Sequence, residues 1–137
     1  MRLAAILGLK SVEPVSRGKA LRMVRKAPLF RSMSHAALSG LIDESFQTIY
    51  DTNAIIIRQG EQDDAVYMVL EGRVRVTYSD SAPEVSVAEL GAGEIFGELA
   101  VLEKKPRNAN VVTLERTNCL RVPGAVFIAA LRQSQSS

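Results

Sequence analysis

The fold is decided by the segment Arg73-Val74-Arg75-Val76-Thr77-Tyr78, in which polar and apolar side chains alternate. A period of two places every second side chain on the same face of a β-strand, so the valines are predicted to face a core and the polar residues to face solvent. Val66, Met68 and Leu70 alternate in the same way just before this segment, and Glu71-Gly72 suits a turn. These residues predict two consecutive strands joined by a turn.

Short segments of β character continue on both sides of this pair. Ala54-Ile55-Ile56-Ile57 is rich in β-branched residues, and Val85-Ser86-Val87-Ala88 alternates again. Val111-Val112 and Leu120-Arg121-Val122 are predicted to belong to two later strands. About seven or eight short strands at regular spacing are typical of a sandwich or barrel such as a jelly roll.

Helical patterns flank the β region at both ends. Residues 16–27 place apolar side chains at helical spacing, and a second helix is predicted to begin near Ser34, which is a good N-cap residue. A final helix is predicted from Pro123, because proline is tolerated in the first turn of a helix. The fold class is therefore mainly β with flanking helices.

The charge of the chain is unevenly distributed. Residues 1–27 carry seven basic side chains and one acidic side chain, and the remaining 110 residues carry ten basic and fourteen acidic side chains. A basic segment contacts nucleic acid, anionic lipid or an acidic protein surface, or it is simply a solvated helix face. We predict a basic N-terminal helical arm over residues 1–27 and a ligand-binding domain over residues 28–137.

The cysteine and histidine counts exclude several classes of function. The single cysteine, Cys119, allows no intrachain disulfide and fits a reducing compartment, so we predict a cytoplasmic location. The single histidine, His35, cannot supply the several metal ligands of a cupin-like enzyme, and no Ser/His/Asp or Cys/His set is available. No apolar run approaches the length needed to span a bilayer. We predict no metal, no cofactor and no catalytic activity.

One segment, residues 93–111, breaks the β pattern. Within it Ile95-Phe96 is strand-like, residues 98–102 have helix-forming composition, and Pro106 stops that helix. Gly97 lets the backbone approach a ligand closely, and the unpaired N–H groups in the first turn of a helix attract phosphate oxygens. The segment therefore has the composition of an anion site.

Arg107 and Glu98 extend this interpretation. The guanidinium of Arg107 presents a planar fork of donors that suits a phosphate, and the carboxylate of Glu98 suits a sugar hydroxyl. Because an acid beside a phosphate alone would be repulsive, the pair favours a ligand with both a phosphate and a hydroxyl. From these residues alone, a surface ion pair between Glu98 and Arg107 beside an ordinary loop stays an open alternative.

A resemblance to a known family rests on the same segment. The run Phe96-Gly97-Glu98-Leu99-Ala100, followed by Pro106-Arg107-Asn108-Ala109, resembles the phosphate-binding cassette of cyclic nucleotide-binding domains. That family includes the regulatory subunits of protein kinase A, cyclic nucleotide-gated channels and the bacterial catabolite activator protein. The resemblance extends from about Pro28 to Leu131 and includes the turns at Gly60 and Glu71-Gly72. It implies an eight-stranded jelly-roll β-sandwich with N-terminal helices and a C-terminal helix, with the nucleotide inside the roll.

The resemblance also implies roles for individual residues. Glu98 would bond the ribose 2′-hydroxyl, and Arg107 would bind an exocyclic phosphate oxygen. Val101 aligns with the cassette residue that packs against a hinge aromatic in this family, and Phe127 aligns with that aromatic. Further donors would be backbone amides of the cassette, those of Gly97, Glu98, Leu99 and Ala109.

The residue that follows the cassette arginine bears on nucleotide selectivity. The residue after the arginine is often Ala or Ser in cAMP-binding members and Thr in many cGMP-binding members, whereas here it is Asn108. An amide donates or accepts, so it fits either base. We predict cAMP because the threonine is absent, and cGMP binding or a ligand-free protein-interaction module of the same fold stays an alternative.

The resemblance predicts a signal-transduction domain whose allosteric output lies elsewhere. The effector would be an attached domain or a partner protein, and the family's final lid helix is expected to be missing after the helix at Pro123. No helix-turn-helix follows the β region, so we expect no nucleic-acid binding by this chain. Membrane contact is expected only if the domain is fused to a channel.

Overall fold

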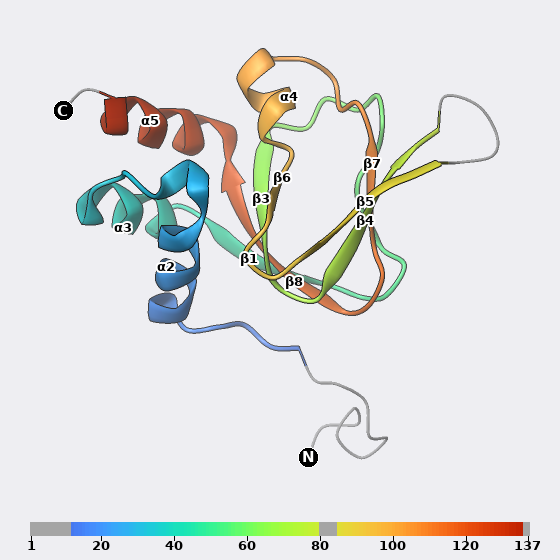
Figure 1. Cartoon of the computed structure of the whole chain (residues 1–137), viewed down its shortest axis with the longest axis horizontal. Helices are drawn as coiled ribbons and strands as arrows, with labels where there is room; N and C mark the ends of the chain where they lie inside the picture. Colours follow the sequence, from blue (N-terminus) through green and yellow to red (C-terminus); the bar gives the residue numbers. More distant parts are fainter. Residues whose placement is uncertain (1–11, 80–84, 136–137) are drawn as a thin grey trace.

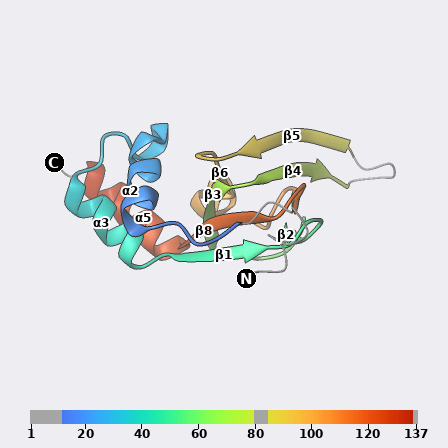
Figure 2. The same cartoon turned by 90° about the horizontal axis from the view of Figure 1, so that it is seen from below.

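Two four-stranded antiparallel sheets face each other in the computed structural model, which describes residues 12–79 and 85–135 (Figures 1 and 2). The eight-stranded jelly roll predicted for this chain is confirmed within these ranges. The first sheet has the order β1 (Phe46–Tyr50), β8 (Thr117–Pro123), β3 (Ala65–Glu71) and β6 (Ile95–Phe96). The second has the order β2 (Ile55–Ile57), β7 (Asn110–Thr113), β4 (Arg73–Tyr78) and β5 (Val85–Gly91).

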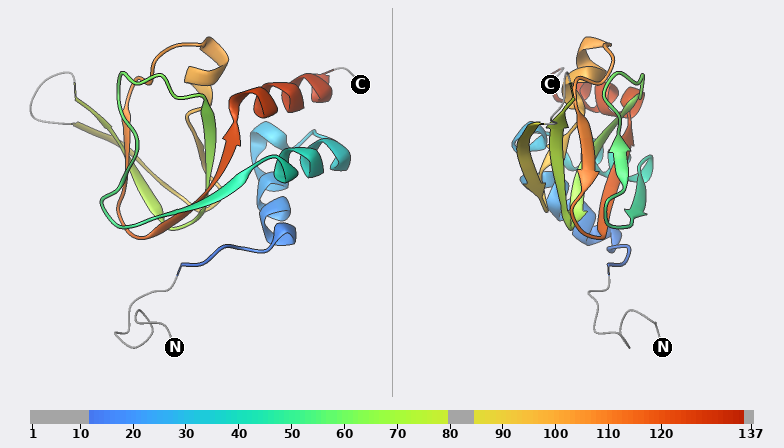
Figure 3. Two further views of the ribbon diagram at one scale, coloured as in Figure 1. Left: turned by 180° about the vertical axis from the view of Figure 1, so that it is seen from behind. Right: turned by 90° about the vertical axis from the view of Figure 1, so that its right-hand side faces the viewer.

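The helices gather at one end of the sandwich, except for α4, which lies at the edge of the roll (Figures 1 and 3). Serine N-caps begin two of them: the hydroxyl of Ser16 accepts from the Lys19 amide, and that of Ser34, the predicted N-cap, accepts from the Ala37 amide. The helical segments are α2 (Arg17–Lys26), the 3₁₀ helix η1 (Pro28–Phe30), α3 (His35–Asp43), α4 (Glu98–Glu103) and α5 (Gly124–Gln135). Pro123 ends β8, so the final helix begins one residue later than predicted.

Strand β3 is buried on both faces, which the simple alternation of its residues did not predict. Met68 and Leu70 point to the helical cluster, whereas Tyr67 and Val69 point into the roll. All six residues from Ala65 to Leu70 are buried. The physical reason is that helices cover one face of the first sheet and the second sheet covers the other.

Strands β4 and β5 differ although both alternate in sequence. In β4 Val74 is buried and Arg73 and Arg75 are exposed, as predicted, whereas Thr77, predicted to face solvent, is buried next to a shift in the pairing with β5. In β5 Val85 and Val87 are exposed, because this edge strand pairs only with β4 and a bulge interrupts that pairing. Alternation therefore predicts a strand but not its partners.

The helical cluster joins both ends of the chain. Phe127 of α5 is completely buried and meets the ring of Phe30 edge-on, with ring centroids 5.8 Å apart. Ala20 and Val24 of α2 are buried in the same cluster. Residues 17–26 of the predicted arm thus pack on the domain, and the first eleven residues lie outside the described residues. The boundary at residue 27 stays a prediction.

Within the described ranges, none of the helices has both the length and the apolar character that crossing a membrane requires. The same ranges contain no group of three or more His, Cys, Asp or Glu side chains arranged to hold a metal ion. Cys119 is fully buried in the roll, and burial raises the pKa of its thiol to about 12. A thiol with so high a pKa is a packing residue rather than a nucleophile.

Candidate ligand-binding site

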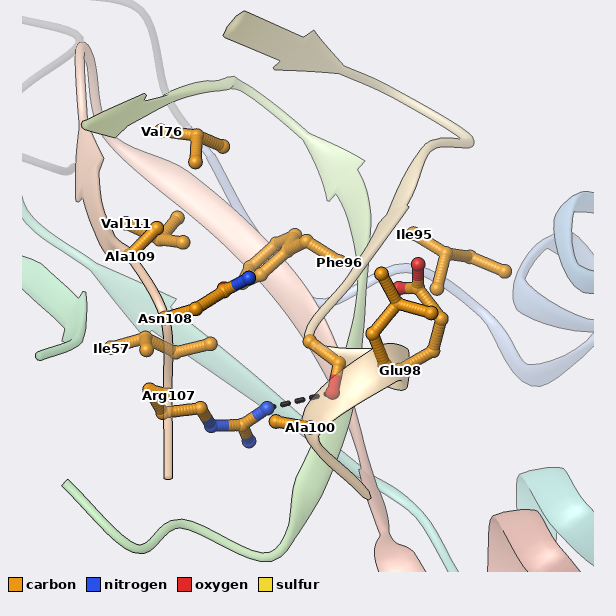
Figure 4. Close-up of a pocket in the computed structure, with 12 residues that line it drawn as sticks. Ile57, Val76, Ile95, Phe96, Glu98, Ala100, Arg107, Asn108, Ala109 and Val111 are labelled. Carbon is orange, nitrogen blue, oxygen red and sulfur yellow. Dashed lines mark hydrogen bonds between the residues drawn. The ribbon is translucent and has the colours of Figure 1, made fainter. Parts of the chain in front are cut away.

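A pocket opens where the short strand β6 meets α4 and the loop that leads into β7 (Figure 4). Apolar side chains of Ile57, Val76 and Val111 line it on the side of the second sheet. The remaining lining comes mostly from the predicted cassette, and it includes all six predicted ligand-binding residues: Gly97, Glu98, Leu99, Arg107, Asn108 and Ala109. The fold thus brings the two halves of the cassette together around one cavity.

Gly97 occupies a backbone conformation that few other residues adopt. Its φ is +86°, in the left-handed region, and it is the N-cap of α4. A β-carbon at this position would lie 2.8 Å from Nη1 of Arg107. Glycine is therefore required both by the turn and by the close approach of the arginine.

Arg107 is buried beside this turn. Its Nη1 donates to the carbonyl oxygen of Gly97 at 2.7 Å, as Figure 4 shows, and its Nη2 donates to the carbonyl oxygen of Ala65. Its ion pair is with Asp63, at 3.3 Å between Nη2 and Oδ2. The alternative of a surface ion pair between Arg107 and Glu98 is wrong, because Arg107 is 3% exposed and its ionic partner is Asp63.

Backbone hydrogen bonds hold Arg107 against the loop between β2 and β3. Its amide donates to the carbonyl oxygen of Glu61 at 2.9 Å, and its own carbonyl oxygen accepts from the Gly60 amide at 2.7 Å. Asp63 lies two residues after Glu61 in this loop. Sequence reasoning missed Asp63, although the acidic turn that contains it is visible beside Gly60.

Two polar atoms of the site are buried without a hydrogen-bond partner. They are Oε2 of Glu98, at the start of α4, and Nε of Arg107, on the segment before β7. Both residues line the same pocket. A buried polar atom without a partner costs free energy, so such atoms point to a ligand that completes them. The missing partners are a donor for the carboxylate and an acceptor for the guanidinium.

The remaining predicted residues lie in different surroundings. Asn108 is exposed on the pocket lining, and Leu99 is also exposed there. Val101 and Phe127 are both buried in the helical cluster, and neither lines the pocket. The structure thus puts the two predicted hinge residues in one apolar cluster, and their coupling stays a prediction.

The jelly roll thus places the buried Arg107 and the half-buried Glu98 on one pocket. The family described as "Cyclic nucleotide-binding domain" matches residues 47–134. The chain belongs to the cyclic nucleotide-binding domain family.

Relatives in this family come from both channels and kinases. A cyclic nucleotide-gated potassium channel of Rhizobium etli is 36% identical over 127 residues, which are 90% of this chain and 34% of that protein. The type II regulatory subunit of cAMP-dependent protein kinase from Drosophila melanogaster is 33% identical over 89 residues, 65% of this chain and 24% of the relative. The chain thus spans about a third or less of the length of these two relatives.

Solved structures show the same architecture. The regulatory domain of Toxoplasma gondii protein kinase A, crystallised with cAMP, has a TM-score of 0.80 at 26% identity over 87% of this chain and 46% of the other. A regulatory subunit of a cAMP-independent protein kinase A from Trypanosoma brucei has a TM-score of 0.77 at 25% identity, covering 86% of this chain and 42% of that one. Membership of the family therefore does not by itself identify cAMP as the ligand.

Proposed function

We propose that this chain binds cAMP in the pocket between β6, α4 and the loop before β7. The observation that carries the proposal is that two residues lining one pocket each hold a buried polar atom without a hydrogen-bond partner, Nε of Arg107 and Oε2 of Glu98. A cyclic nucleotide supplies phosphate oxygens for the first and a ribose 2′-hydroxyl for the second. Backbone amides of Gly97, Leu99 and Ala109 would add donors to the phosphate.

The preference for cAMP rests on Asn108. It lines the pocket and is exposed, so its amide is available to a base. It is not the threonine associated with cGMP. The alternatives are cGMP, or a module of this fold that has lost its ligand. The two unpartnered atoms favour a ligand. In a module without a ligand, both atoms would stay buried without a hydrogen-bond partner, which costs free energy.

Isothermal titration calorimetry with cAMP, cGMP and cyclic di-GMP tests the proposal. Wild-type protein should bind cAMP more tightly than the other two. Arg107→Ala should weaken binding by about 2–5 kcal/mol, or roughly 30-fold to several thousand-fold in Kd, because it leaves the phosphate without its buried partner. Arg107→Lys should also bind poorly, since an ammonium cannot form the planar fork.

A matched control separates the site from general effects of charge. Arg116→Ala removes a half-exposed arginine whose ion pair is with Asp51, and it should bind cAMP as the wild type does. Urea denaturation of each variant shows whether the protein remains folded. Equal cAMP affinity for wild type and Arg107→Ala would contradict the proposal.

The regulatory output is proposed to pass from α4 to α5. Ligand contacts that move α4 would carry Val101 with it, and Val101 shares a buried cluster with Phe127. Such a change is a population shift between two packings, which the ligand drives only by favouring one of them. We propose that the effector is an attached domain or partner protein and that the chain acts in the cytoplasm, without nucleic-acid binding or catalysis of its own.

A fluorophore on α5 tests this coupling. Val101→Ala should reduce the cAMP-induced signal change while leaving cAMP affinity within about threefold, because Val101 does not line the binding pocket. An unchanged signal amplitude would place the hinge elsewhere.

A further inference from the structure

Asp63 stands between two cations. Its Oδ2 lies 3.3 Å from Nη2 of Arg107, and its Oδ1 lies 3.6 Å from Nη2 of Arg121. The side chain of Asp63 is 21% exposed and that of Arg121 is 38% exposed, so solvent screens both pairs only in part. Arg107 thus already has an anionic partner before any ligand arrives, and Arg121 competes for that partner.

The strands hold Arg121 in this position. Tyr67 of β3 is paired with Arg121 of β8 on one side and with Phe96 of β6 on the other. The ring of Tyr67 stacks on that of Phe96, with centroids 5.1 Å apart, and Phe96 directly precedes Gly97. A row of three side chains therefore crosses the inner face of the first sheet and ends at the pocket.

Tyr67 joins the row to the carboxylate. Its hydroxyl donates to Oδ2 of Asp63 at 3.0 Å. Burial raises the pKa of Tyr67, so the hydroxyl stays protonated and remains a donor. Asp63 is consequently held in place whether or not Arg107 is its partner.

The charges indicate what Arg121 does. Two carboxylates belong to this site: that of Asp63 is in ion-pair contact with the guanidinium of Arg107, and Glu98 lines the same pocket as Arg107. With Arg107 alone, this group would carry a net negative charge, which repels an anion. Arg121 adds the positive charge that neutralises Asp63.

We propose that Arg121 is a positioning residue for the phosphate site. It neutralises the charge of Asp63, so that the positive charge of Arg107 is available to an anionic ligand. This inference rests on the proposed function and extends it to a residue outside the pocket lining. When a phosphate binds Arg107, Asp63 keeps its contacts with Arg121 and Tyr67. Ligand binding therefore does not leave the partly buried carboxylate of Asp63 without a partner.

Calorimetric titration of the full chain with cAMP tests this inference in four variants. Arg121→Gln should weaken binding about tenfold, since it exposes Arg107 to an uncompensated carboxylate. Adding Asp63→Asn to Arg121→Gln should restore affinity to within about threefold of wild type, because residues 63 and 121 of the double variant together again carry no net charge. Arg116→Gln is the matched control for the lost positive charge and should bind as wild type does. Asp63→Asn alone should not weaken binding.

The outcomes separate this inference from the proposed function. If wild type binds none of the cyclic nucleotides, both are overturned. If wild type binds cAMP and Arg121→Gln binds equally well, only the role of Arg121 is overturned. Weakened binding without rescue in the double variant would show that Arg121 acts through packing, and this also contradicts the inference. Rescue by Asp63→Asn supports it, because a structural role of Arg121 would not respond to the charge at residue 63.

Discussion

The two faces of β3 support two regions of different character. On one face Met68 and Leu70 pack into the helical cluster with Phe127, where the buried side chains are apolar. On the other face Tyr67 and Val69 point into the roll, and the hydroxyl of Tyr67 contacts Asp63, the ionic partner of Arg107. Glu98 and Arg107, which each hold a buried polar atom without a partner, line the same pocket at the edge of the roll. One strand thus links a region built for stability to a region that leaves contacts open for a ligand.

The largest expected effect tests the helical side. Phe127→Ala should reduce the free energy of unfolding by about 3–5 kcal/mol, because it empties the centre of the cluster and removes the edge-on contact with Phe30. Urea denaturation measures this loss. Phe127→Leu fills most of the space and should cost far less. In the folded fraction the cAMP affinity should stay close to wild type. A loss of binding free energy as large as the loss of stability would contradict the division into two regions.

Glu98→Ala should act in the opposite sense. It removes a buried carboxylate oxygen that has no partner, so the free energy of unfolding should not fall. Binding of cAMP should weaken by about 1.5–3 kcal/mol, the range for a hydrogen bond to a charged group. Titration with 2′-deoxy-cAMP measures the sugar contact: wild type should prefer cAMP, and the variant should lose most of that preference. Full discrimination by the variant would mean that another group binds the 2′-hydroxyl.

Gly97→Ala should damage both stability and binding. A left-handed conformation costs a residue with a side chain about 1–3 kcal/mol, and the new methyl group would meet Arg107. Gly93→Ala is a matched control, because Gly93 has a φ of +89° and open space around the added carbon. Both variants should lose similar backbone stability, and only Gly97→Ala should also weaken cAMP binding. Equal affinities for the two variants would show that Arg107 tolerates the contact.

Ser34→Ala should have the smallest effect, confined to stability. It removes the side-chain cap of α3, whose hydroxyl accepts from the Ala37 amide at 3.1 Å, and such caps contribute about 1 kcal/mol. Thermal denaturation should show a small fall in Tm, with cAMP affinity unchanged. A change in affinity would show that α3 communicates with the pocket, which the comparison of the two regions does not predict.

Local pattern was sufficient for most of the fold and for the composition of the pocket. The alternation of residues 73–78 predicted β4, the apolar spacing of residues 16–27 predicted α2, and the N-cap residue Ser34 predicted the start of α3. The cassette segment placed all six predicted ligand-binding residues on one pocket. These features depend on neighbours within a few residues, so periodicity, capping and turn chemistry determine them.

Only the tertiary structure decided which partners these residues meet. The sequence alone did not show that β3 is buried on both faces, that β5 is an exposed edge, or that Asp63 is the partner of Arg107. Arg121 lies 58 residues from Asp63 along the chain, and strand pairing brings the two together. Contacts of this kind depend on how sheets and helices pack against one another, and the residues next to a given residue in sequence do not determine that packing.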